Sequence, residues 1–264
     1  MDDITDIWYF SGTGQCRQLA QRIASELKSG GRAVRTVNIT PPEQRKKLLG
    51  EVKCGQLILV FPVYANGLPL VLKAFFKQLV SNKTPVIAAA LWGAAHRGHA
   101  LSDACAILKS VGFLVNGAAE VVSEHSFMHA TAPICGNRPT EREKTELIEY
   151  IKRRIGQSDG VSVPAPKDSL IVKLVCSLPD NLVVHSVVKL LMDSGKCTKC
   201  GACIKMCPTE AVRADLSIDE SRCVRCLSCV SNCKPSARAY RVKKIAVFAL
   251  GHHKNSSESN RLYE

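Results

Sequence analysis

Eight cysteines near the C-terminal end have the spacing of metal-cluster ligands. They form two runs, CTKCGACIKMC and CVRCLSCVSNC, and each run separates its cysteines by two, two and three residues. Three thiolates spaced so closely can bind one corner of an iron–sulfur cubane, while the following short helix carries the fourth to the neighbouring cluster. The two runs therefore predict two [4Fe–4S] clusters.

This exchange of the fourth ligand assigns the cysteines to two groups of four. The first cluster is bound by Cys197, Cys200, Cys203 and Cys233, and the second by Cys223, Cys226, Cys229 and Cys207. A zinc site would draw two ligands from each of two separated pairs. A disulfide framework suits a short secreted chain, and this sequence shows no signal peptide. The runs resemble those of bacterial two-cluster ferredoxins, although Lys234 separates Cys233 from the following proline.

A second candidate site lies near the N-terminus. The apolar segment Ile4–Phe10 precedes the loop SGTGQC, and residues 18–28 then have apolar side chains at helical spacing. A strand, a glycine-rich loop and a helix place free backbone N–H groups where a phosphate binds. A dinucleotide fingerprint would need a third glycine where Arg17 stands, and no Gly-Lys-Ser/Thr sequence is present for a nucleoside triphosphate.

The loop resembles the phosphate loop of flavodoxins, in which a Ser/Thr-x-Thr-Gly-x-Thr segment binds flavin mononucleotide (FMN). The last hydroxyl residue of that pattern is replaced by a cysteine, whose thiol is a weak donor. An ordinary strand–helix turn is the alternative. The resemblance implies a phosphate site made by Ser11, Gly12, Thr13, Gly14, Gln15 and Cys16.

Alternating strands and helices would position this loop. The pattern predicts strands at 4–10, 33–39, 56–61, 85–91 and 113–122, and helices at 16–29, 42–50, 69–80, 99–111 and 140–155. Five strands that alternate with helices indicate a doubly wound parallel α/β sheet. In the flavodoxin order 2-1-3-4-5, the ligand lies at the carboxyl ends of strands one and three.

The loops after the third and fourth strands combine aromatic residues with glycines. By resemblance to flavodoxins, these loops would enclose the flavin ring. That assigns Pro62, Tyr64, Asn66 and Gly67 to one side of the ring, and Trp92, Gly93 and Gly98 to the other. The alternative is that Tyr64 and Trp92 only cover the edge of the sheet.

Composition changes divide the chain into four parts. Residues 1–155 are expected to form a flavodoxin-like FMN-binding domain, and 156–192 a linker with one or two amphipathic helices within 170–192. Residues 193–250 would form a small α+β two-[4Fe–4S] ferredoxin domain, covered by the segment 240–250. Residues 251–264 are polar and are expected to be disordered. Docking of the segment 170–192 on a lipid surface is an alternative.

Charge indicates the kind of partner. The net charge is +13, and about −2 from each bound cluster and from the FMN phosphate would lower it to about +7. We therefore expect an acidic redox partner protein. No nucleic-acid-binding motif appears, and the most apolar segment carries four charged or titratable residues, so we expect no transmembrane segment. Thirteen cysteines and oxygen-labile clusters favour a reducing cytoplasm and an anaerobic cell.

Nearly the whole chain resembles ferredoxins with a flavodoxin-like N-terminal region. That resemblance implies electron transfer between FMN, two clusters and a partner, because flavin holds one or two electrons whereas each cluster passes one. The first alternative is an FMN/iron–sulfur oxidoreductase that reduces a small substrate or a partner's cofactor at the flavin. The second is a redox-sensing regulator, for which no effector module is found.

Overall fold

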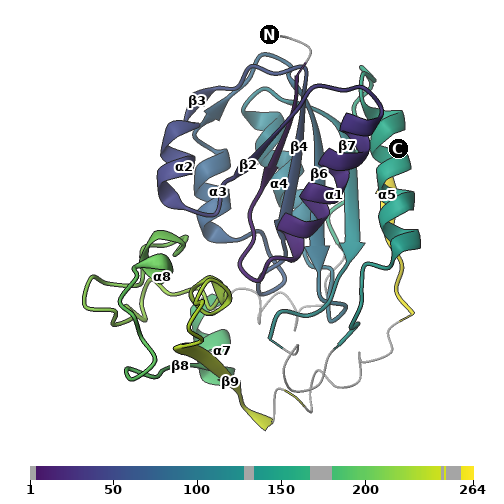
Figure 1. The fold of residues 1–264 in the computed structure, drawn as a ribbon. Coiled ribbons are helices and arrows are strands. Elements are labelled where there is room, and N and C mark those ends of the chain that lie inside the picture. Colours follow the sequence, from purple (N-terminus) through teal and green to yellow (C-terminus); the bar gives the residue numbers. More distant parts are fainter. Residues whose placement is uncertain (1–3, 128–133, 167–179, 245–246, 248–256) are drawn as a thin grey trace.

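The computed structural model describes residues 4–127, 134–166, 180–244, 247 and 257–264. A large α/β domain is built from the N-terminal part of the chain, and a smaller part that contains the cysteine runs lies against its lower edge in Figure 1. No described helix is long and apolar enough to cross a membrane.

Five parallel strands form the centre of the large domain. They are β1 (Thr5–Tyr9), β2 (Val34–Asn38), β4 (Gln56–Pro62), β6 (Pro85–Trp92) and β7 (Leu114–Val122). Their order across the sheet is β2-β1-β4-β6-β7, which is the expected order 2-1-3-4-5. The predicted doubly wound, flavodoxin-like sheet is confirmed. The short strands β3 (Gly50–Glu51) and β5 (Leu79–Val80) pair separately.

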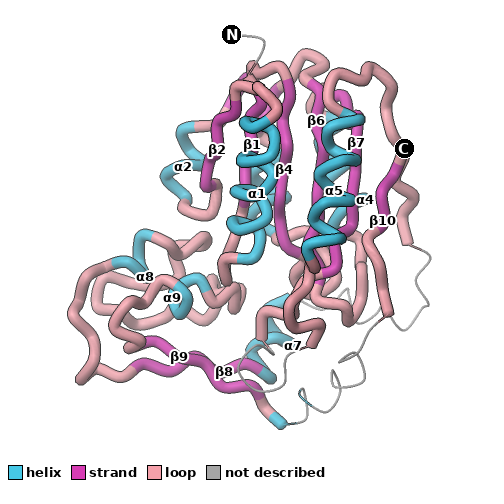
Figure 2. Tube along the Cα trace, turned by 45° about the vertical axis from the view of Figure 1, so that its right-hand side comes forward, coloured by secondary structure: helices cyan, strands magenta, loops and turns pink. Residues whose placement is uncertain are grey.

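Helices cover both faces of the sheet (Figure 2). On one face, α1 (Gln15–Ser29) and α5 (Glu141–Arg154) pack against strand residues such as Ile58. On the other, α3 (Leu70–Phe76) and α4 (Ala100–Ser110) pack against neighbours such as Leu57. Because successive strand residues point to opposite faces and both faces are covered, β4 has the continuous apolar sequence of a central parallel strand. The short helix α2 (Pro42–Lys47) follows β2.

The C-terminal residues 257–264 differ from the expected disordered tail. Residues 261–263 form β10 (Arg261–Tyr263), which pairs antiparallel with β7. Without it, β7 would be an edge strand with unpaired backbone groups, so the tail satisfies part of that edge. The hydroxyl of Tyr150 on α5 also donates to the Tyr263 carbonyl at 2.5 Å. The sheet therefore has six strands, one more than expected, while 251–256 lie outside the described residues.

The smaller part also differs from expectation at its start. Of the segment predicted to be helical, 170–179 lies outside the described residues, and α7 (Asp180–Val187) is a helix. The chain then forms a strand, β8 (Val188–Met192), which pairs antiparallel with β9 (Arg238–Val242). These strands flank the cysteine runs, so their pairing closes that segment into one unit. Of the predicted cover at 240–250, residues 245–246 and 248–250 lie outside the described residues.

The two cysteine runs follow the same backbone course at an offset of 26 residues. The helix α8 (Ala202–Lys205) in the first run corresponds to α9 (Ser228–Ser231) in the second. Lys199 and Arg225 have φ angles of 54° and 52°, and Gly201 and Leu227 have 72° and 61°. Left-handed backbone is unfavourable for Leu and Arg. Its recurrence at matching positions shows that both turns adopt one required geometry.

The contact between β10 and β7 predicts that the C-terminal residues stabilise the large domain. Deleting residues 257–264 should lower its free energy of unfolding by about 2 kcal/mol, because an edge strand and its packing are lost. Tyr150→Phe keeps the strand but removes one buried donor, and should cost about 1 kcal/mol. Both tryptophans lie in this domain, so denaturant unfolding can be followed by their fluorescence. An unchanged midpoint after the deletion would contradict this role.

Candidate cofactor-binding site

The helix α1 begins with backbone N–H groups that no side chain of the described residues caps. Its N-cap, Gly14, has a φ of 103°, and within the described chain no side chain caps the helix. The Ser11 hydroxyl accepts from the Gly14 N–H at 3.1 Å, and the Ser11 N–H donates to Thr40 Oγ1 at 2.8 Å. These bonds fix the loop and leave the first N–H groups of α1 available to an anion. The geometry fits a phosphate group.

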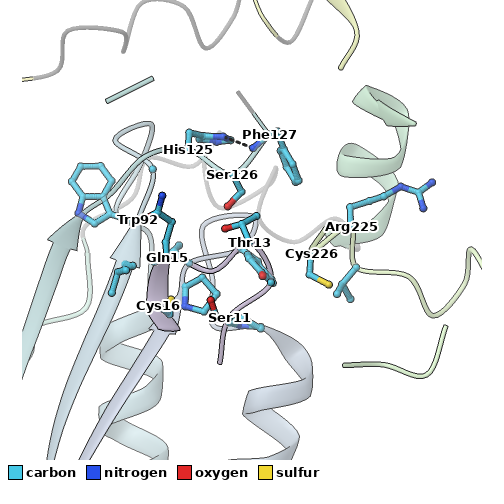
Figure 3. Close-up of a pocket in the computed structure, with 18 of the residues that line it drawn as sticks. Ser11, Thr13, Gln15, Cys16, Trp92, His125, Ser126, Phe127, Arg225 and Cys226 are labelled. Atoms are coloured by element: carbon cyan, nitrogen blue, oxygen red, sulfur yellow. Dashed lines mark hydrogen bonds between the residues drawn. The ribbon is translucent and has the colours of Figure 1, made fainter. Parts of the chain in front are cut away.

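A single pocket joins this loop to the two loops predicted to enclose a flavin (Figure 3). Thr13 and Ser126 point toward one another across it. Nine of the thirteen predicted flavin-site residues line the pocket: Ser11, Gly12, Thr13, Gln15, Cys16, Pro62, Tyr64, Trp92 and Gly93. Burial raises the pKa of the Cys16 thiol, so this residue stays neutral and offers only its backbone N–H to a phosphate.

The other four predicted residues lie outside the pocket wall and support it. Gly14 is the N-cap of α1 and lines a smaller adjoining pocket. Tyr64 and Gly67 exchange backbone hydrogen bonds at 2.8 and 3.0 Å, which closes a turn with positive φ at both central residues. The carbonyl of Asn66 accepts from the His99 N–H at 2.7 Å. A Cβ atom at Gly98 would lie 1.9 Å from that carbonyl oxygen, so glycine is required there.

The two aromatic residues of the predicted ring site differ in position. Tyr64 packs edge-on against Phe10 with ring centroids 6.3 Å apart, and burial raises the pKa of its hydroxyl. Trp92 is buried at the edge of the pocket, and its ring points away from Thr13. The Arg97 guanidinium lies 4.5 Å from the Trp92 ring centroid and covers one face. Trp92 therefore lines the pocket and also covers the edge of the sheet.

Sequence reasoning missed one wall of the pocket. Residues 123–127, which follow β7, line it with His125 and Phe127. A Cβ atom at Gly93 would lie 2.7 Å from the His125 ring, so this glycine allows the two loops to pack closely. The buried Ser123 hydroxyl and Trp92 indole N–H have no hydrogen-bond partner within the described residues, so the site has polar capacity for a ligand. The only sequence signal was that β7 ends at the same sheet edge as β6.

The cysteine-containing part forms the remaining wall. Val224, Arg225 and Cys226 line the pocket, and a Cβ atom at Gly12 would lie 2.1 Å from the Cys226 carbonyl oxygen. Arg45 on α2 provides a second connection between the two parts. Its buried guanidinium donates to the Thr40 carbonyl at 2.6 Å and to the Pro208 carbonyl at 2.5 Å. Burial lowers the pKa of Arg45 to about 10, so it remains charged at neutral pH.

The second cysteine group converges on one small apolar cavity. It is lined by all four cysteines assigned to that group: Cys207, Cys223, Cys226 and Cys229. The Ala211 N–H donates to Cys207 Sγ at 3.1 Å, and Arg225 Nη1 donates to Cys223 Sγ at 3.2 Å. Burial raises the pKa of Cys226 and raises the pKa of Cys229 to about 12, so these two thiols ionise poorly without a nearby cation. Soft, buried and hydrogen-bonded sulfurs fit an iron–sulfur cluster.

The first cysteine group is more open. Cys200 is exposed, and Cys197, Cys203 and Cys233 are half-buried. The Lys199 N–H donates to Cys197 Sγ at 3.4 Å. Every described cysteine is a free thiol. Within the described chain, no three Cys, His, Asp or Glu side chains are placed to hold one metal ion.

Strand order and pocket define a flavodoxin-like α/β domain joined to a small ferredoxin-type domain. Residues 191–213 match the family described as a 4Fe-4S binding domain, which covers the first run only. No curated protein matches the chain.

Several solved structures are similar to the chain. A flavodoxin from the domain Archaea is 12% identical, with 55% of this chain and 92% of that chain covered and a TM-score of 0.40. Megasphaera elsdenii flavodoxin is 20% identical, with 45% and 85% covered and a TM-score of 0.35. Rubredoxin oxygen:oxidoreductase from Desulfovibrio gigas is 16% identical, with 58% and 35% covered and a TM-score of 0.36. The fold assignment rests on the strand order.

The close approach at Gly12 predicts that an added methyl group will disturb the pocket. Gly12→Ala should weaken FMN binding at least about tenfold, because the phosphate loop must move away from the Cys226 backbone. Gly30→Ala is the matched control, since its Cβ atom would meet nothing closer than 3.5 Å. Quenching of FMN fluorescence measures both affinities. Equal affinity in the two variants would show that this contact does not shape the pocket.

Proposed function

We propose that this chain is an electron-transfer protein that binds FMN in the pocket and two [4Fe–4S] clusters at the cysteine groups. The position of Cys226 carries the proposal. Cys226 lines both the pocket at the α1 loop and the cavity formed by the second cysteine group. A flavin in the pocket and a cluster in the cavity would therefore be separated by little more than this residue. Such proximity favours the exchange of single electrons.

Each part of the site has a distinct role in this proposal. The first turn of α1 and the hydroxyl groups of Ser11 and Thr13 bind the FMN phosphate. The loops after β4, β6 and β7 enclose the flavin, which can hold one or two electrons, whereas a cluster passes one. The second cysteine group is the inner cluster site, beside the flavin. The first group, with its exposed Cys200, is the outer site that faces a partner.

The charge around the outer site supports an acidic redox partner protein. Four exposed lysines lie beside the cysteines of the first group: Lys196, Lys199, Lys205 and Lys234. Exposed positive charge accelerates encounter with a negatively charged surface. Arg225, which stands between Cys223 and Cys226 in the second run, is buried and does not contribute to this surface. A reducing compartment such as the cytoplasm would keep the free thiols available for cluster assembly.

One observation favours a second candidate function, reduction of a small substrate at the flavin. The loop after β7 brings the carboxyl residue Glu124 and the imidazole of His125 to the pocket wall. Groups of this kind can exchange protons with a substrate. Anaerobic turnover of a natural metabolite without any protein partner would support this function over the carrier function.

Iron analysis tests the cluster assignment. The anaerobically reconstituted chain should bind about eight irons, and Cys207→Ser should bind about four, because the second group loses its ligand from the first run. Cys54→Ser is the matched control, since Cys54 is a half-buried free thiol outside both runs. Zinc in place of iron, or eight irons in Cys207→Ser, would contradict the assignment.

FMN release tests the flavin site. The purified chain should release FMN on denaturation, and Thr13→Ala should weaken FMN binding about tenfold through loss of a hydroxyl donor to phosphate. Thr145→Ala on α5 is the control, because its hydroxyl donates to the Glu141 carbonyl of the same helix and lies outside the pocket lining. Binding is measured by flavin fluorescence. Absence of any bound flavin after reconstitution would refute the FMN site.

A further inference from the structure

Arg225 is a buried cation in direct contact with a cysteine of the second group. Its side chain is 6% exposed, and Nη1 donates to Cys223 Sγ at 3.2 Å. Nε donates to the Val188 carbonyl at 3.1 Å, which fixes the guanidinium against β8. Figure 3 shows the side chain directed away from the pocket, beyond Cys226 as seen from Thr13. The charge of Arg225 therefore acts mainly on the second cysteine group.

The first group has no equivalent buried cation at the matching position. The offset of 26 residues places Lys199 where Arg225 stands, with the same left-handed backbone. Lys199 is exposed, and its hydrogen bond to Cys197 Sγ comes from its backbone N–H. An exposed ammonium group is screened by water and salt, whereas a buried guanidinium bonded to sulfur is screened much less. The two groups are thus alike in backbone and different in electrostatics.

Glu220 moderates the charge of Arg225 without cancelling it. Its carboxylate lies 2.5 Å from Arg225 Nη2 and is 58% exposed. The guanidinium bonds the sulfur directly, whereas the carboxylate is bonded to the guanidinium and is partly solvated. The charge nearest to Cys223 Sγ is therefore positive. A hydrogen bond and a positive charge at a ligand sulfur favour the reduced, more negative form of a cluster.

We propose that Arg225 gives the inner cluster site a higher reduction potential than the outer site, so that a single electron shared by the two sites resides beside the flavin pocket. This inference rests on the proposed function. Arg225 acts through the sulfur of Cys223, which it contacts, and is not itself oxidised or reduced. An electron from a one-electron donor protein at the exposed outer site would then move to the inner site without an uphill step.

The test is a potentiometric titration of the reconstituted full-length chain, followed by electron paramagnetic resonance. Cys207→Ser identifies the signal of the inner site, since it should lack that cluster. Arg225→Gln should lower the equilibrium constant for reduction of the inner site at least about tenfold, or ~59 mV for one electron, and leave the outer site unchanged. Arg225→Lys should recover part of the shift. Lys199→Gln, the matched variant, should change the outer site less than about twofold.

Glu220→Gln should shift the potential of the inner site in the opposite direction to Arg225→Gln. It also changes an exposed side chain in place of a buried one. Removing this exposed carboxylate leaves the charge of Arg225 unopposed, so the potential of the inner site should rise. The inference is overturned if Arg225→Gln binds about eight irons with an unchanged inner potential, or if Glu220→Gln does not raise it. A wild-type chain with about four irons contradicts the proposed function instead, and the inference falls with it.

Discussion

The approach of the Cys226 backbone to Gly12 is the contact on which the organisation of this molecule depends. A carbonyl oxygen in the second cysteine run occupies the space where any other residue at position 12 would place its Cβ atom. The contact brings a phosphate-type loop, which needs glycine for its own backbone, against a cysteine that faces an apolar cavity on its other side. One pocket wall is thereby shared by two sites that lie more than 200 positions apart in the sequence.

Other interactions maintain this contact from both sides. Arg45 binds carbonyl groups at the end of β2 and the carbonyl of Pro208, which follows a cysteine of the second group. Its charge is stabilised by three carbonyl oxygens in a buried position, where the loss of any one would leave an unpaired donor. The paired strands β8 and β9 close the cysteine-containing segment at its ends. The position of Cys226 is therefore fixed by interactions from both domains.

The sequence predicted the strands and helices that alternate along the N-terminal part of the chain. It missed short elements and loop contacts that occur only once. Alternation of apolar strands with helices predicted all five parallel strands, because both periods extend over many residues, whereas their order was implied by the resemblance to flavodoxins. β10 has three residues in a polar tail, too few for a period to appear. β8 follows α7 without a break, so its apolar residues continued a helical pattern. Asn66, Gly67 and Gly98, which are predicted to lie at the flavin ring, shape the turn that follows Tyr64 and lie outside the pocket lining. The role of His125 depends on a loop contact that no local pattern encodes.

The matching backbone course of the two cysteine runs gives their differences in side chains a physical meaning. With the backbone conserved between the halves, the surroundings of the sulfurs distinguish the sites: one is apolar, buried and bonded to a guanidinium, and the other is open and flanked by lysines. Burial alone would disfavour added negative charge and lower the affinity of the inner site for an electron. A cation bonded to the sulfur opposes that effect, because in a poorly solvated site its field is weakly screened. A cation such as Arg225 therefore makes it easier for an inner site to accept an electron, and the Glu220 carboxylate weakens the effect of that charge.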